Sequence, residues 1–454
     1  MTEKKRTFWD FADHFEGDKV VWIIVLMLFF ISLVCMFSST SRLLDEGETR
    51  LDIIKSQFGI VLAGLGLIVL CYNIKNIRFY RWCSKWGFLV SLVLLVILDL
   101  HKPVGPIKPI NLNNAYRILS VAGVQIHVFE VVKVAMVLYL SWAIDAFQKK
   151  ELKWPEKNIW KKITYLYVPF LLTFILIIPG SNSSALFIGG MMFIVLLLGG
   201  GNFKDLMILG AAGILIVALC FGVFKLSDGK YMKRIGTGIS RITEKEDYED
   251  IFLKSTKGSL QYQKALDAIR QPYSAKIAIH QGGLFGKGPG QSTQRYVVPD
   301  ISEDFMFSFI LEEYGILGGI LVIFLYVSLL ARASIIVRNC DKKDNFAKLA
   351  VAGLCILITG QAFMHMFVNA DIGPMTGQTL PLISHGNSAF LCFCLAFGVI
   401  LSISRISFRR IQRETMNAEP LMEMTGGVED ELRDLDDFES GNTENFDDYE
   451  DYDL

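Results

Sequence analysis

The segment VVWIIVLMLFFISLVCMFSS, Val20–Ser39, is an uncharged and almost wholly apolar run. About 20 such residues are needed for a helix to cross about 30 Å of hydrocarbon. Residues 1–19 before it are charged throughout, so we expect a cytoplasmic N-terminal segment and no cleavable signal peptide. About ten runs of this kind follow one another along the chain: 20–39, 57–73, 84–99, 128–147, 163–178, 184–200, 205–225, 305–331, 347–368 and 388–405. The sequence therefore predicts an all-α polytopic integral membrane protein, with a ten-span domain at 20–410.

Composition agrees with a membrane protein and excludes two other classes. Of 454 residues, 52% are hydrophobic, which is too many for an ordinary soluble enzyme. The formal net charge of −1 argues against nucleic acid as a partner. This near balance hides a segregation, because residues 419–454 hold 15 Asp or Glu and only Arg433 as a base. We expect residues 411–454 to form an acidic, disordered cytoplasmic tail.

Basic residues assign the two sides of the membrane. They cluster before the first span and after the second, fourth, eighth and tenth, and by the positive-inside rule these segments face the cytoplasm. The clusters are Lys4 to Arg6, Lys75 to Lys85, Lys149 to Lys162, Arg332 to Lys343 and Arg405 to Arg413. Both termini are then cytoplasmic. The outer side receives a large loop at about 226–303, between the seventh and eighth spans, and two shorter loops at 100–127 and 369–387.

The cytoplasmic loops lack any motif for a nucleotide. They contain no P-loop and no GxGxxG opening a helix. The eight cysteines and six histidines show no metal-ligand spacing, so no metal site is predicted from them. The three outer loops, in contrast, are rich in Gly, Pro, Asn and Ser, as functional loops often are. We expect the chemistry to lie on the outer face and to make no direct use of ATP.

Two of the outer loops carry unusual polar patterns. The glycines of Gly282–Ser292 allow close backbone approach to a ligand and could aim N–H groups at anionic oxygens. After this loop Asp304 stands where the outer segment enters the eighth span, either as a functional carboxylate or as a helix N-cap. The segment Asn369–Ser388 contains two prolines and three glycines, which predicts a broken path lining a protein cavity.

A third polar group lies around the first of these loops. Arg117 precedes the fourth span, and Glu130 and Lys133 are three residues apart within it. That spacing places the two side chains on one helix face, where they can pair. A purely structural ion pair and a functional one are equally open.

Together these motifs resemble the SEDS family of cell-wall proteins, over about residues 20–410. The family's glycine-rich loop and its proline–acidic–Asp–Phe run correspond to Gly286–Ser292 and Pro299–Phe305, and its GEELG-like stretch to Glu312–Gly315. Asp371–Ser388 matches its third signature, and Tyr262-Gln263 its YQ pair. Departures occur at Asn114, Ile118 and Asn387, where the family has Gly, Trp and Gly, and at Val128, where it has proline.

The resemblance implies a peptidoglycan glycosyltransferase that polymerises lipid II on the outer face of the inner membrane during cell division. Asp304 would be the general base for the acceptor GlcNAc 4-hydroxyl, and undecaprenyl pyrophosphate would leave. Arg117, Lys133 and Arg295 are the expected pyrophosphate contacts, with Glu130 holding Lys133 and a divalent cation, Mg or Mn, able to share the task. The other expected substrate-binding residues are Gln263, Lys287, Gly288, Gly290, Ser292, Pro381, Ser384, His385 and Ser388.

The same resemblance implies partners: a single-span class B penicillin-binding transpeptidase, other division proteins and membrane lipid. Two alternatives belong to other classes. A lipid II flippase would move the substrate without joining it, although no inverted repeat is visible in the sequence. A non-catalytic division scaffold would only assemble partners. The outer-face Asp304 among basic residues favours the polymerase, because a transporter needs polar groups near mid-membrane.

Overall fold

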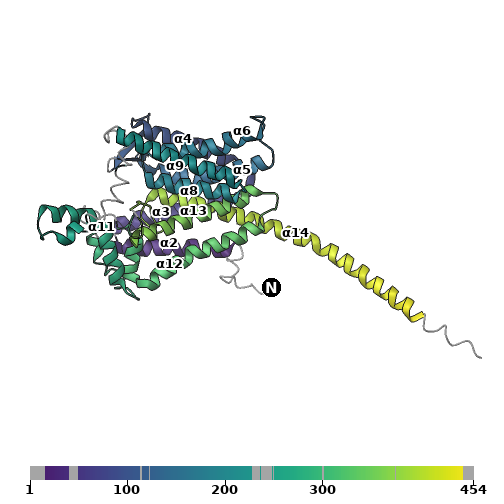
Figure 1. The fold of residues 1–454 in the computed structure, drawn as a ribbon. Helices are drawn as coiled ribbons and strands as arrows, with labels where there is room; N and C mark the ends of the chain where they lie inside the picture. The colour runs from purple at the N-terminus through teal and green to yellow at the C-terminus, as the bar shows by residue number, and fades with distance from the viewer. Residues whose placement is uncertain are drawn as a thin grey trace, which may run out of the picture.

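The computed structural model describes residues 16–39, 50–112, 115–121, 123–226, 236, 248, 250–298, 301–373 and 375–442. The side chains of residues 50–54, 112, 115, 267–268 and 418–442 are not included in this description. Most of the chain forms a bundle of long, roughly aligned helices, from which the last helix projects (Figure 1).

The helices follow the predicted spans closely. Those within the predicted spans are α2 (Lys19–Ser39), α3 (Arg50–Tyr72), α4 (Ile77–Leu100), α5 (Val128–Gln148), α6 (Asn158–Lys162) with η2 (Ile163–Tyr167) and α7 (Val168–Ile177), α8 (Asn182–Leu198), α9 (Phe203–Leu226), α12 (Met306–Asn339), α13 (Asn345–Asn369) and α14 (Asn387–Asn442). The polytopic helical fold is thus confirmed. In the described part of the chain eight helices are long and apolar enough to cross a membrane. The exact number of ten spans stays a prediction, because α8 has only 17 residues and α5 carries Glu130, Lys133 and Asp145.

The first of the outer loops forms a small sheet within this helical fold. Strands β1 (Ile107–Leu112), β2 (Ala115–Val121) and β3 (Val124–His127) form an antiparallel sheet in the order β1-β2-β3. The short run Val124–His127 (VQIH) alternates apolar and polar residues with the two-residue period of a strand, a signal that the span-based interpretation passed over. The sheet ends at His127, directly before α5, and so fixes the outer end of that helix.

The large outer loop also contains regular structure. Helix α11 (Leu260–Gly282) lies there and packs against α12, and the turn η3 (Gln294–Tyr296) follows the glycine segment. In Figure 1 α11 stands at the end of the bundle, away from the point where α14 leaves it.

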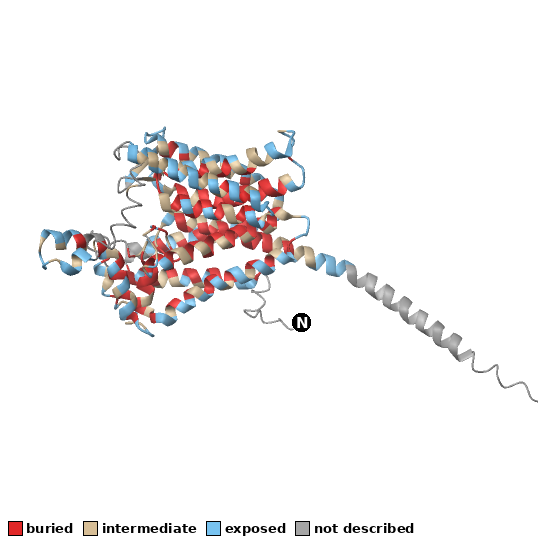
Figure 2. Ribbon diagram, viewed as in Figure 1, coloured by how far each residue is buried: buried red, intermediate tan, exposed pale blue. Residues whose placement is uncertain are grey.

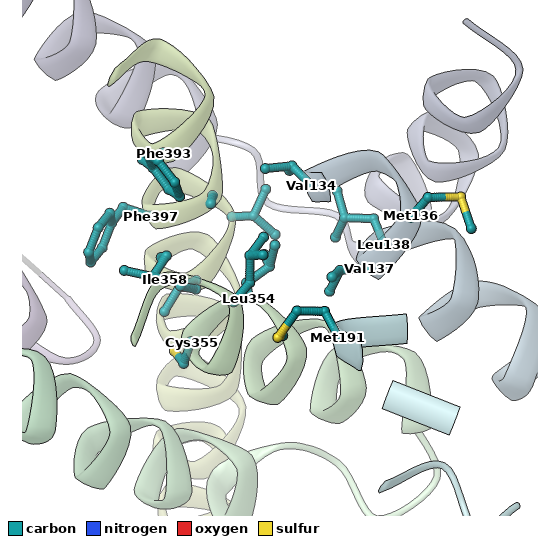
Figure 3. Packing of buried hydrophobic residues seen from close by; sticks show 14 of the residues in the cluster. Val134, Met136, Val137, Leu138, Met191, Leu354, Cys355, Ile358, Phe393 and Phe397 are labelled. Atoms are coloured by element: carbon teal, nitrogen blue, oxygen red, sulfur yellow. The ribbon is translucent and has the colours of Figure 1, made fainter. Parts of the chain in front are cut away.

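The packed centre of the bundle lies between α5, α8, α13 and α14. Figure 3 shows Val137, Met191, Leu354 and Phe393 converging there from these four helices, and all four are fully or almost fully buried. A Cβ added at Gly353 would lie 2.6 Å from Cγ1 of Val137, so glycine is what allows α13 to approach α5 this closely. The outer faces of the peripheral helices are exposed and apolar, as expected for contact with lipid (Figure 2).

The first part of the acidic tail is helical in the structure. Residues 411–442 continue α14 as one helix that leaves the bundle (Figure 1). A helix without packing partners gains no tertiary stabilisation, and Pro420, Gly426 and Gly427 weaken it further. Residues 443–454 lie outside the described part of the chain. Disorder of the tail in solution stays a prediction.

Candidate functional site

Asp304 is held by its backbone at the outer end of α12. The carbonyl oxygen of Asp304 accepts a hydrogen bond from Nδ2 of Asn369, at 3.0 Å. The carbonyls of the two residues before it are also bonded: Ser384 Oγ donates to Glu303 O at 2.8 Å, and the backbone N–H of His385 donates to Ser302 O at 2.8 Å. Residues of the segment 369–385 therefore bond to three consecutive carbonyls. These bonds hold in place the backbone from which the half-buried Asp304 side chain extends.

The N-cap interpretation of Asp304 is not supported by the start of α12. The N-cap residue is Phe305, whose side chain cannot accept a hydrogen bond, and no side-chain cap bond is made there. Asp304 lies one residue earlier. Its carboxylate is directed instead toward Gly377, where an added Cβ would lie 3.5 Å from Asp304 Oδ2.

Arg117 reaches the same glycine from strand β2. The added Cβ at Gly377 would lie 3.9 Å from Arg117 Nη1, so the guanidinium and the carboxylate border the same backbone position. Arg117 Nε donates to Gly180 O at 3.3 Å, in the turn before α8. Asp304, Arg117 and Gly377 thus form one polar centre at the outer end of the bundle. Gly377 has φ +60°, in the left-handed region that favours glycine.

The loop that carries Gly377 is irregular backbone that is exposed at Gly377 and mostly buried over residues 378–384, as the prolines and glycines predict. Its carbonyls are bonded by helix side chains: Tyr326 OH donates to Pro381 O at 2.6 Å, and Gln361 Nε2 to Thr379 O at 3.0 Å. A nitrogen of His365 lies 2.7 Å from Gln378 O. Non-helical backbone at this depth needs such internal partners, because lipid offers none.

Lys133 is the most heavily bonded of the predicted residues. Its Nζ lies 2.7 Å from each of three acceptors, Glu130 Oε1, Gln361 Oε1 and Gln378 Oε1, and the residue is only 2% exposed. An ammonium group has three N–H donors, and these three acceptors use them all. Lys133 therefore ties α5 and α13 to the Gly377 loop, and it does not reach outward as the predicted phosphate contact would.

The glycine-rich loop wraps around two buried glutamates, in contrast to the expected ligand cradle. Glu312 and Glu313 of α12 are both fully buried. The backbone N–H groups of Lys287 and Gly288 donate to the carbonyls of these two residues, at 2.9 and 3.0 Å. The N–H of Ser292 donates to Glu313 Oε1 at 3.2 Å, and that of Thr293 to Glu312 Oε1 at 2.9 Å. These N–H groups are aimed at the protein's own oxygens.

Side chains of the loop complete this inner cluster. Lys287 Nζ pairs with Glu312 Oε1 at 2.6 Å, and Ser292 Oγ donates to Glu312 Oε2 at 2.5 Å. The N–H of Gly290 donates to Ser38 Oγ at 3.1 Å, and Arg295 Nη1 donates to Ser38 O at 3.1 Å. Lys287, Gly288, Gly290, Ser292 and Arg295 thus belong to a buttress around Glu312 and Glu313. About two turns of α12, roughly 11 Å, separate this buttress from the Asp304 end of the helix.

The remaining predicted residues take separate positions. Pro381, Ser384 and His385 lie in the Gly377 loop, and their bonds to Tyr326, Glu303 and Ser302 make them supports of the polar centre. Ser388 accepts at Oγ from the backbone N–H of His127, at 3.0 Å, and so joins α14 to the sheet. The His127 imidazole itself is largely removed from water, and this burial lowers its pKa below the ordinary value for histidine. Gln263 lies exposed on α11, and its backbone N–H donates to Ser259 O.

Sequence reasoning missed several residues that shape the centre. Asn369 bonds to the Asp304 turn, and Gln361 and His365, also of α13, contact the carbonyls of the Gly377 loop. A signal was present, because uncharged polar residues recur within an otherwise apolar helix, and intramembrane polar residues are costly unless they have partners. In the described ranges no group of three His, Cys, Asp or Glu could hold a metal ion.

Fold and site together define a polytopic membrane protein with a charged, half-buried centre at one end of its helical bundle. A family model described as "Cell cycle protein", which groups FtsW, RodA and SpoVE, matches residues 18–408. The chain belongs to this family, and it is FtsW-like, as the SEDS resemblance predicted. The prediction of an enzyme of the glycosyltransferase class is likewise confirmed.

Individual relatives are similar along most of their length. The chain is 28% identical over 424 residues to the probable peptidoglycan glycosyltransferase FtsW of Enterococcus hirae, covering 89% of this chain and 96% of that one. It is 26% identical over 396 residues to stage V sporulation protein E of Bacillus subtilis, covering 86% and 97%.

Solved structures share the fold. A chain described under the structural coordination of polymerization and crosslinking by a peptidoglycan synthase complex has a TM-score of 0.61 and 18% identity, covering 86% of this chain and 98% of that one. RodA of Thermus thermophilus, solved as an aspartate-to-alanine variant, has a TM-score of 0.56 and 18% identity, with 86% and 97% covered.

Proposed function

We propose that this protein polymerises lipid II into glycan strands, with Asp304 as the general base. The observation that carries the proposal is the shared border of Asp304 and Arg117 on Gly377. The carboxylate of Asp304 can accept a proton, and the guanidinium of Arg117 can bind an anion. Gly377 between them has no side chain, which leaves room for a substrate. The family and its relatives named peptidoglycan glycosyltransferases support the reaction class.

The reaction needs one proton acceptor and one anion-stabilising group. As the acceptor 4-hydroxyl attacks the anomeric carbon of the donor sugar, its proton passes to the Asp304 carboxylate. The new glycosidic bond forms while the bond from that carbon to the pyrophosphate oxygen breaks. Undecaprenyl pyrophosphate leaves with the bonding electrons, and the guanidinium of Arg117 stabilises its growing charge through charge-assisted hydrogen bonds.

The other predicted residues act through this pair. Lys133 and Glu130 hold Gln378 and thereby the backbone of Gly377. The glycine loop and Arg295 brace the start of α12 through Glu312, Glu313 and Ser38. We assign these residues to positioning. A divalent cation could still accompany the pyrophosphate as a ligand of the substrate's own oxygens.

The setting follows from the charge pattern. The polar centre lies at the bundle end opposite the basic clusters, so we assign it to the periplasmic face and the protein to the division site. A class B penicillin-binding transpeptidase would act beside it and cross-link the strand. The relative found in a peptidoglycan synthase complex supports such a pairing.

The decisive experiment measures lipid II polymerisation by the purified protein together with its transpeptidase. Asp304→Asn keeps the shape of the side chain but removes its negative charge, and we expect activity to fall by about 10²- to 10⁴-fold. Asp250→Asn makes the same chemical change at an exposed residue of the large outer loop and should leave activity near that of the wild type.

Two outcomes would contradict the proposal. A well-folded Asp304→Asn protein that polymerises within a fewfold of the wild type would remove Asp304 from the base role. A wild-type complex that moves lipid II between leaflets but never joins two molecules would favour the transporter alternative. Folding of each variant is checked by its thermal unfolding in detergent and by its binding to the transpeptidase.

A further inference from the structure

A cavity with charged side chains in its wall opens at the opposite end of the bundle from Asp304, where three chain segments meet. It has a volume of about 320 Å³ and is bounded by the turn between α3 and α4, the turn between α12 and α13, and residues 405–413 of α14. The charge pattern assigns this end to the cytoplasmic leaflet. Five cations and two carboxylates line the cavity: Lys75, Arg405, Arg409, Arg410 and Arg413, with Asp341 and Asp344.

Three of the five cations already have acidic partners. Arg405 Nε lies 3.0 Å from Glu16 Oε2, and Arg409 also pairs with Glu16. Arg410 Nη1 lies 3.3 Å from Asp341 Oδ2. These pairs hold the wall of the cavity in place, since they join α14 to the N-terminal segment and to the turn after α12.

The other two cations are not neutralised by the part of the chain that the structure describes. Neither the Lys75 ammonium nor the Arg413 guanidinium makes a side-chain hydrogen bond or ion pair among those residues. In addition, Nε of Arg410 is buried and donates no hydrogen bond there, although Glu414 Oε1 lies 3.5 Å away. A cavity wall that presents two unpaired cations and a buried unused donor is suited to an anion with several acceptor oxygens.

We propose that this cavity binds the phosphate headgroup of an anionic phospholipid of the inner leaflet. Basic pockets between membrane helices on the cytoplasmic side bind such headgroups, and the surface potential of anionic lipids favours them there. The wall includes Ile77 and Ala347, which suit the glycerol and upper acyl region beneath a phosphate. The acidic tail of this chain is a rival occupant, but it leaves the bundle as a continuation of α14, the helix that forms one wall (Figure 1).

The test uses the full-length protein purified in nanodiscs of phosphatidylcholine with and without phosphatidylglycerol. Retained lipid is counted by native mass spectrometry after mild detergent extraction. Lys75→Gln with Arg413→Gln removes the two unpaired cations, and we expect the affinity for phosphatidylglycerol to fall by roughly tenfold or more. The matched control is Lys153→Gln with Lys157→Gln, which removes two exposed cations from the same predicted face. A third arm adds inorganic phosphate as competitor.

A lipid headgroup site would be supported if bound phosphatidylglycerol is lost only in the Lys75→Gln, Arg413→Gln variant. The wild type should also retain phosphatidylglycerol in the presence of inorganic phosphate. Equal loss in both double variants would show only diffuse attraction to the membrane and overturn the proposal. Displacement of the lipid by inorganic phosphate at low millimolar concentration would show a site for the free anion instead. Lipid retention that appears only after deletion of residues 419–454 would assign the cavity to the tail.

Discussion

Nζ of Lys133 donates a hydrogen bond to Oε1 of Gln378 at 2.7 Å, across 245 positions of sequence. This bond joins α5 to the loop that carries Gly377, and Gly377 is the residue bordered by both Asp304 and Arg117. A buried cation of α5 therefore supports the backbone on which the two reacting groups meet.

Lys133→Met should destabilise the protein strongly. The substitution leaves Glu130, Gln361 and Gln378 without their shared donor, and breaking a buried charged pair costs about 3–5 kcal/mol. Thermal unfolding in detergent measures the loss. Lys149→Met is the control, because Asp145 keeps Arg81 as a second partner, at 3.0 Å, and we expect a loss under about 1 kcal/mol. Equal losses of stability in the two variants would show that the three acceptors around Lys133 contribute no more than the Lys149–Asp145 pair.

Gly377→Ala should reduce polymerisation more than it reduces stability. The new methyl group would stand 3.5 Å from Asp304 Oδ2 and 3.9 Å from Arg117 Nη1, in the space assigned to the reacting groups. The left-handed backbone adds about 1–2 kcal/mol of strain. Lipid II polymerisation and thermal unfolding are measured on the same preparation. Gly105→Ala is the control, since its φ is +59° and nothing lies within 4 Å of its added Cβ. If the Gly377→Ala protein remained active, the reacting groups of the substrate would not lie beside Gly377.

Gly286→Ala should detach the glycine loop from α12. Its φ is +80° and an added Cβ would lie 2.2 Å from the backbone oxygen of Glu313, so the loop must move away. Gly290→Ala carries a similar backbone strain at φ +77°, but nothing lies within 4 Å of the added Cβ. Limited proteolysis of the outer loops compares the two. We expect faster cleavage for Gly286→Ala alone, and identical cleavage would argue that the loop does not depend on this contact.

Acidification should weaken the cytoplasmic end of the bundle through Glu16. The hydrogen bond from Arg409 holds the pKa of Glu16 below its ordinary value, against the opposing effect of burial. A folded-state pKa below the unfolded one gives stability that is fully present above the unfolded pKa, about 4.3 for Glu. This stability is lost as pH falls through the folded value. Thermal unfolding from about pH 7 to about pH 3 should therefore show a steeper decline for the wild type than for Glu16→Gln. Parallel declines of thermal stability in the two proteins would exclude the Glu16–Arg409 pair as the source of the pH dependence.

The side assignment can be tested by labelling cysteines introduced into a cysteine-free background. Cysteines at Gln291 and Ile372, both exposed in predicted outer loops, should react with an impermeant maleimide from the periplasmic side. Cysteines at Lys157 and Lys342, also exposed, should react only after the inner membrane is broken. Reaction of positions 291 and 342 from the same side would contradict the predicted topology and the periplasmic location of the site.

The sequence by itself determined the membrane class, the approximate position of each helix and the presence of Asp304 at a helix entrance. These properties depend on local features: runs of apolar residues such as Val20–Ser39 are long enough to span, and charge clusters mark their ends. The motifs around Gly286 and Pro381 were equally visible, because glycine and proline restrict or free the backbone wherever they occur.

Only the tertiary structure decided what the polar residues contact. Lys133 and Arg295 are both cations near predicted outer loops in the sequence, yet one is enclosed by three acceptors and the other donates to Ser38. Arg117 of β2 and Asp304 before α12 are 187 positions apart in the sequence. In the structure both border Gly377. Such contacts depend on how helices pack and which carbonyls lack partners, and side-chain spacing along one segment contains no information about either.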